Sequence, residues 1–92
     1  MDDNTSAGTS REIWAAIQAE RCRQSVKWAE PHAHGQGDCS SPGVPLMVKV
    51  AVLAEECGEV ARAALDGKPE QMRDELIQVA AVAVAILEGG CS

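Results

Sequence analysis

The chain has 92 residues and a formal net charge of −6, with 14 acidic side chains against eight basic ones. A chain this short forms one small domain that buries only about 60% of its unfolded surface, so it commonly relies on metals, disulfides or oligomerisation. The acidic balance argues against nucleic-acid binding and against a membrane-surface helix, since both need a basic face. We therefore predict neither a nucleic acid nor a membrane as a partner.

The composition favours helices. Aromatic residues make up 2% of the chain, as Trp14 and Trp28, so the core must consist of aliphatic side chains. Valines lie within Ala- and Glu-rich stretches and not in the two-residue alternation of strands, which predicts an all-α fold. Four cysteines without a C-x-x-C pair, and an acidic N-terminus unlike a signal peptide, indicate reduced thiols and a cytoplasmic location.

Three helices are predicted within a single domain, residues 10–88. Residues 1–9 are expected to be disordered up to Thr9, which forms a capping box with Glu12. The predicted elements are a helix over about 10–29, a loop over 30–45, helices over about 46–65 and 69–88, and a tail over 89–92. Gly67 suits the left-handed position after the second helix, and Pro69 suits the first turn of the third.

The second and third helices are apolar nearly all round. One helical hairpin and one more polar N-terminal helix offer too few surfaces to bury both of them. A second copy of the hairpin would complete a four-helix bundle core. We therefore predict a homodimer or a homotetramer.

Acidic residues interrupt both apolar helices. They are Glu55, Glu56 and Glu59 on the second helix and Asp74 and Glu75 on the third, where Gln78 follows. In an antiparallel hairpin that turns near Gly67, Glu59 faces Glu75, and Glu56 lies level with Gln78. Like charges at such range raise one another's pKa and destabilise the fold unless a cation neutralises them. Mg²⁺, with Mn²⁺ as a substitute, prefers such oxygen ligands; the alternative is a solvated acidic surface.

These residues carry a family resemblance. Residues 52–63, VLAEECGEVARA, resemble a helix of the MazG-like nucleotide pyrophosphohydrolases, the small stand-alone type in the all-α NTP pyrophosphatase superfamily. Residues 75–82 are similar to that family's next helix, and residues 20–28 to its first. The family pattern is E-E-x-x-E followed by E-x-x-D. This chain departs from it at Gln78, whose amide oxygen brings no charge, and Asp74, closer to the turn, does not replace it directly.

The resemblance implies magnesium-dependent hydrolysis of nucleoside triphosphates, including deoxynucleotides or modified nucleotides, to the monophosphate and pyrophosphate. It implies Glu56, Glu59, Glu75 and Gln78 as metal ligands. Glu55 and Glu56 are the expected catalytic residues, with Glu55 either a ligand or the base that accepts the proton of the attacking water. The alternative is a helical oligomer that binds a nucleotide or a protein partner without turnover.

Substrate contacts are expected outside the acidic motif. Lys49 lies seven residues before Glu56 on the same helix face, and is either a phosphate ligand or an ordinary solvated lysine. Trp28 is either a stacking surface for the base or a packing residue at the end of the bundle. Gln24 and Lys27 are placed to reach the base edge or the phosphates.

Three further residue types have simpler interpretations. Trp14 is expected in the core, and Cys57 is expected to be a small buried residue. His32, His34 and Cys39 lack a fourth zinc ligand, so their loop is interpreted as one that closes over the substrate.

Overall fold

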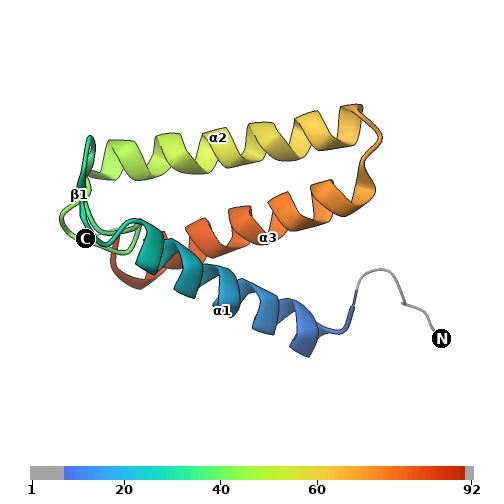
Figure 1. Cartoon of the computed structure of the whole chain (residues 1–92), viewed down its shortest axis with the longest axis horizontal. Helices are drawn as coiled ribbons and strands as arrows, with labels where there is room; N and C mark the ends of the chain where they lie inside the picture. The colour runs from blue at the N-terminus through green and yellow to red at the C-terminus, as the bar shows by residue number, and fades with distance from the viewer. Residues whose placement is uncertain (1–7, 91–92) are drawn as a thin grey trace.

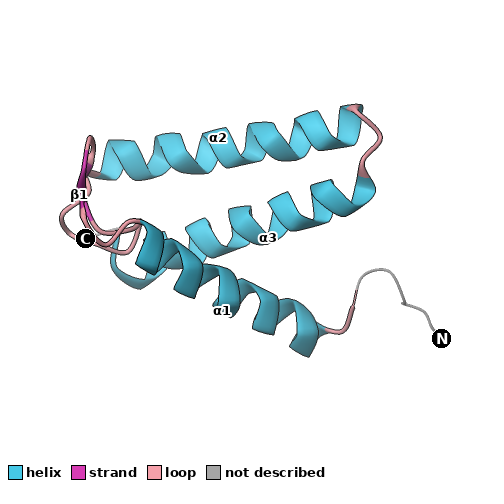
Figure 2. Ribbon diagram, in the orientation of Figure 1, coloured by secondary structure: helices cyan, strands magenta, loops and turns pink. Residues whose placement is uncertain are grey.

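The computed structural model describes residues 8–90, which are mostly helical, as the sequence predicts (Figures 1 and 2). The elements in chain order are α1 (Ser10–Lys27), β1 (Pro31–His32), β2 (Gly35–Gln36), α2 (Leu46–Leu65), α3 (Pro69–Ala85) and a π-helical turn, η1 (Ile86–Gly90). β1 and β2 pair antiparallel. This small hairpin lies in the segment that was predicted as a loop without regular structure.

The N-terminus of α1 forms the predicted capping box. The Glu12 amide donates to Thr9 Oγ1 at 3.1 Å, and the Thr9 amide donates to Glu12 Oε1 at 2.8 Å. Residues 1–7 of the expected disordered segment lie outside the described residues, as do residues 91–92 of the expected tail. Gly89, also placed in that tail, belongs to η1.

A tight turn joins α2 to α3. Gly67 has a φ of 68°, the left-handed conformation predicted for it. The amides of Gly67 and Lys68 donate to the carbonyls of Ala64 (3.2 Å) and Ala63 (3.0 Å), which satisfies the end of α2. Pro69 then starts α3, where its missing N–H costs nothing. The two helices therefore run antiparallel.

α3 is the central helix, because α1 and α2 each pack on it, as Figure 1 shows. The contact surface consists of small or medium side chains, among them Ile17 of α1, Ala63 of α2, and Ala81, Val82 and Ala85 of α3. No large side chain within residues 8–90 is fully buried. The monomer thus has a thin core, as expected for a short Ala-rich chain.

Several apolar residues are exposed. Trp14 is 52% exposed, so the prediction that it lies in the core is wrong; among the helices of the described residues, α1 packs on α3 alone and buries a single narrow face. The prediction of a buried Cys57 is also wrong, since this residue is exposed on α2. None of the described helices combines the length and the hydropathy needed to cross a membrane.

Candidate metal centre

Three glutamates from two helices meet between α2 and α3. Glu56 and Glu59 of α2 and Glu75 of α3 each offer one carboxylate oxygen, and these oxygens lie within 4.8 Å of one another. The antiparallel hairpin brings Glu59 and Glu75 to the same level, as the residue count from Gly67 predicted. No other group of His, Cys, Asp or Glu within residues 8–90 meets so closely.

The cluster is electrostatically costly. Burial, followed by the charges of Glu59 and Glu75, raises the pKa of Glu56 to about 7. Burial and the contact with Glu59 also raise the pKa of Glu75. Oε1 of Glu56 and Oε1 of Glu75 are shielded from solvent without a hydrogen-bond partner. Shielded oxygens of this kind destabilise a fold unless a proton or a cation satisfies them.

The donor set fits a hard divalent cation. All three groups supply carboxylate oxygens, and Glu56 and Glu75 each have one unpartnered oxygen with free lone pairs. Mg²⁺ and Mn²⁺ prefer such ligands, whereas zinc favours nitrogen and sulfur. Glu59 is exposed to solvent, which leaves room for the waters that Mg²⁺ retains.

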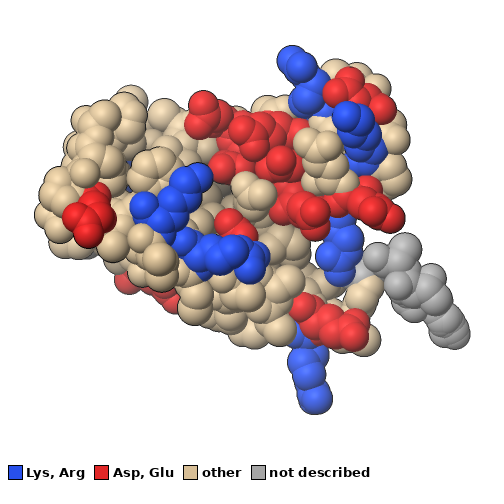
Figure 3. All heavy atoms as spheres, in the orientation of Figure 1, with Lys and Arg blue, Asp and Glu red and all other residues tan. Residues whose placement is uncertain are grey.

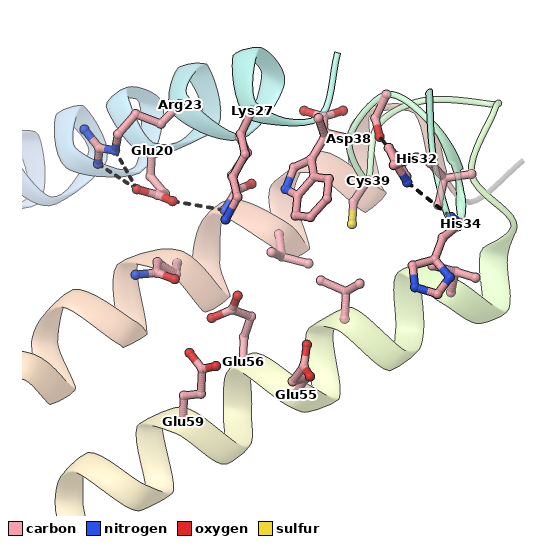
Figure 4. A pocket seen from close by; sticks show the side chains of 18 residues that line it. Glu20, Arg23, Lys27, His32, His34, Asp38, Cys39, Glu55, Glu56 and Glu59 are labelled. Atoms are coloured by element: carbon pink, nitrogen blue, oxygen red, sulfur yellow. Dashed lines mark hydrogen bonds and ion pairs between the residues drawn. The ribbon is translucent and has the colours of Figure 1, made fainter. Parts of the chain in front are cut away.

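A cavity of about 670 Å³ adjoins the carboxylates and extends between α1 and α2. Its size is typical of sites for small molecules. Among its lining residues are seven predicted as site residues: Gln24, Lys27, Trp28, Glu55, Glu56, Glu59 and Gln78. In Figure 4, Glu55, Glu56 and Glu59 point from α2 toward this space. Figure 3 shows acidic side chains gathered between α2 and α3, with basic side chains alongside them toward α1.

Two predicted site residues, Glu75 and Lys49, are not among the residues that line the cavity; Glu75 belongs to the carboxylate cluster, whereas Lys49 does not. The side chain of Lys49 is only 2% exposed, so it is not an ordinary solvated lysine either. Val48 and Val52 line the cavity at this end of α2. Lys49 lies on the same face of α2 as Glu56, two turns earlier, but at Lys49 this face is buried. The helical spacing alone did not reveal this burial.

An aromatic surface lies at the other end of the cavity. Trp28 is 40% exposed and lines the cavity, so it is not a buried packing residue. Lys27 Nζ lies 5.0 Å from the centre of its ring, and the His32 ring packs edge-on at 5.2 Å. His34 and Cys39 line the same end, without forming a metal-ligating group with His32. An exposed indole with a nearby cation is suited to stack on a planar ring.

α1 contributes a carboxylate that was not predicted as a site residue. The Glu20 side chain is only 15% exposed and lines the cavity. Arg23 Nε donates to it at 2.8 Å and Gln24 Nε2 at 3.3 Å. Its charge adds to those that raise the pKa of Glu56. The spacing of Glu20, Arg23 and Gln24 on one helix face is the signal by which the sequence could have indicated it.

An ion-pair network holds the 30–45 segment against the helices. Asp38 is buried and accepts hydrogen bonds from the Ser40 amide (2.9 Å) and hydroxyl (2.6 Å). Arg21 of α1 donates to Asp38 at 3.0 Å and also pairs with Glu88 of η1. Burial alone would raise the pKa of Asp38, but the hydrogen bonds from Ser40 and the charge of Arg21 lower it. Gly89 also lies against this segment, because a Cβ there would come within 2.7 Å of the Ser40 carbonyl.

We expect Arg21→Ala to loosen this segment. The change leaves the Asp38 carboxylate buried without its cation, at a cost of about 1–3 kcal/mol in the free energy of unfolding. Amides of the segment, such as Gly37 and Val44, should then exchange with solvent faster, as hydrogen-exchange mass spectrometry would measure. Arg11→Ala is the matched control on the same helix. Its side chain is exposed, so a change within about 0.5 kcal/mol is expected; equal effects of both variants would contradict a specific role for Arg21.

Comparison with known proteins identified no relative, since no family model, curated protein or solved structure matches this chain.

Proposed function

We propose that this chain is a magnesium-dependent nucleoside triphosphate pyrophosphohydrolase that works as a homodimer or homotetramer. The observation that carries the proposal is the convergence of Glu56, Glu59 and Glu75, with two shielded, unpartnered oxygens, beside a cavity that ends in an aromatic surface. A triphosphate tail and a divalent cation suit the acidic end, and a nucleobase suits the aromatic end. The likeness of the acidic motif to MazG-like enzymes points to the same chemistry.

The three glutamates would hold Mg²⁺, with Mn²⁺ as a substitute, and Gln78 would add a neutral oxygen at the same level. When bound, the ion neutralises phosphate oxygens and makes a bound water more acidic. Because this chain carries a net charge of −6, its glutamates alone would repel a triphosphate. Their role in the proposal is therefore to fix the cation at the end of the cavity where the phosphates enter.

Glu55 is the proposed base. It lines the cavity one residue before Glu56 and is exposed, so it is suited to accept a proton from water. The water oxygen forms a bond to the α-phosphorus, and the α–β anhydride bond breaks. The electron pair of the broken bond leaves with the pyrophosphate. The proton passes to Glu55 and from there to solvent. Positioning and charge neutralisation dominate such transfers, so few groups are needed.

The nucleobase is proposed to stack on Trp28, which is open to the cavity. Lys27, close to the same ring, and Gln24 supply polar contacts for the base edge or the phosphates. Lys49, buried outside the cavity, has no role in this proposal.

The second candidate is a helical oligomer that binds a nucleotide without turnover. Gln78 favours it, because an amide at this level of the cavity brings one negative charge fewer than the family's aspartate. This candidate shares the cavity and the aromatic surface but needs no attacking water.

A substrate panel separates the two candidates. We expect pyrophosphate release from at least one standard or modified nucleoside triphosphate in the presence of Mg²⁺, and none in EDTA. Glu70→Gln, which alters an exposed residue in the first turn of α3, is the control and should retain activity. Magnesium-dependent nucleotide binding in calorimetry without pyrophosphate release from any member of the panel would favour the binding protein.

A further inference from the structure

The side of α2 that faces away from α3 carries a regular apolar pattern. Exposed residues recur there at alternating intervals of four and three along the whole helix: Met47, Ala51, Ala54, Gly58, Ala61 and Leu65. This is the heptad spacing by which one helix packs on another. In Figure 1, α2 forms one edge of the molecule, with α3 on one side only. Within residues 8–90, therefore, no helix covers the pattern.

Gly58 supports the view that this face has a partner. A glycine inside a helix destabilises the helix by about 1 kcal/mol relative to alanine. A glycine is therefore expected there where close packing leaves no room for a Cβ. A Cβ at Gly58 would meet nothing within 4 Å in this chain. The monomer therefore gives no reason for a glycine here, whereas a helix packed closely across this point would.

The pattern is self-complementary. When two α2 helices are placed antiparallel, Ala54 of each lies opposite Gly58 of the other, and Ala51 lies opposite Ala61. Met47 then lies opposite Leu65 at both ends of the contact. Small residues meet at the centre, and large ones close both ends. Each of these residue pairs occurs twice, as a two-fold axis requires. A parallel pairing would place Gly58 against Gly58 and leave a gap there.

The size of the face is sufficient for such a contact. Met47 is 78% exposed, Leu65 85%, and Leu46 and Val50 50% each. A helix of this length is about 30 Å long and about 11 Å across, so an apolar sector of roughly 140° offers on the order of 500 Å² to a solvent-sized probe. Two copies would bury about 1,000 Å² together, the lower bound for a specific interface.

We propose that two copies of this chain associate through this face of α2, antiparallel, with Ala54 opposite Gly58. The proposal is independent of nucleotide hydrolysis. The glutamates and Val52, which line the cavity, lie on other sides of α2, so the contact leaves the cavity open. It also covers the large apolar residues of α2 that one copy leaves in solvent, which are Leu46, Met47, Val50 and Leu65.

Charge substitutions at Ala51 and Ala61 test both the face and its direction. Sedimentation velocity at tens of micromolar should show the wild-type chain at a mass of at least twice 9.7 kDa. Ala51→Glu places an unpaired carboxylate in the contact and should weaken association at least about 100-fold, which halves the mass. The double variant A51E/A61K brings opposite charges together only in the antiparallel arrangement, so it should recover the wild-type mass.

Circular dichroism verifies that each variant stays helical, and Ala15→Glu on the exposed part of α1 is the matched control, expected to sediment as wild type. A monomeric wild-type chain, or an Ala51→Glu variant that is folded and of wild-type mass, would overturn the interface. A folded A51E/A61K variant that remains at half the mass would overturn the antiparallel register.

Discussion

Replacing Glu56 with glutamine is expected to abolish pyrophosphate release and, at the same time, to stabilise the metal-free protein. Loss of a metal ligand should reduce the magnesium-dependent rate by more than the 10- to 100-fold typical of residues that only support ligands. The stability gain follows because burial and two neighbouring glutamates oppose the charge of Glu56. A neutral amide removes that repulsion and should add about 1–2 kcal/mol to the free energy of unfolding at pH 8, roughly 5–10 °C in Tm.

The pH dependence of this gain identifies its cause. At pH 5, below a pKa of about 7, Glu56 carries a proton and is already neutral. The variant should therefore match the wild type at pH 5 and exceed it at pH 8, as thermal unfolding in EDTA would show. Glu30→Gln, which removes an exposed charge outside the cavity, is the control and should change Tm little at either pH. A Glu56→Gln variant that is less stable than the wild type at pH 8 would show that this carboxylate is not under electrostatic strain.

Magnesium is expected to stabilise the wild-type protein much more at pH 8 than at pH 5. The pKa of Glu56 is raised in the folded state from 4.5 to about 7, so the folded state binds the proton more tightly than the unfolded state does. The stability that the folded state gains from this tighter proton binding is complete below about pH 4.5 and is lost as the pH rises through 7. The raised pKa corresponds to at most about 3 kcal/mol, and partial solvent screening reduces this to about 1–2 kcal/mol.

The measurement is a series of thermal unfolding curves between pH 5 and pH 8, with Mg²⁺ or with EDTA. In EDTA, Tm should fall across this range, and saturating Mg²⁺ should restore it at pH 8, because the ion replaces the lost proton. The carboxylate of Asp38 does not obscure the trend, since the hydrogen bonds from Ser40 and the charge of Arg21 lower its pKa, away from the range between pH 5 and pH 8. A Tm in EDTA that rises from pH 5 to pH 8 would contradict the proposed origin of the strain.

Features of the fold that depend on neighbouring residues follow directly from the sequence. The capping box at Thr9 and Glu12 and the left-handed Gly67 are local patterns, and the structure contains both. The sequence also predicts that Glu59 and Glu75 lie opposite each other, since helical rise and a short turn determine which residues of a hairpin face each other. The convergence of Glu56, Glu59 and Glu75 was therefore predictable before any tertiary contact was known.

The remaining features depend on which surfaces the helices cover, and helical periodicity does not contain that information. Because α1 and α2 both pack on α3 and leave a cavity between them, Glu20 of α1 joins the glutamates of the hairpin, whereas Lys49 is buried away from the cavity. Trp14 stays exposed for the same reason. The sequence by itself determined the helices, their turn and the acidic motif, because these arise from residues close in the chain. Only the tertiary structure decided which side chains meet across the helices, since burial depends on contacts between distant segments.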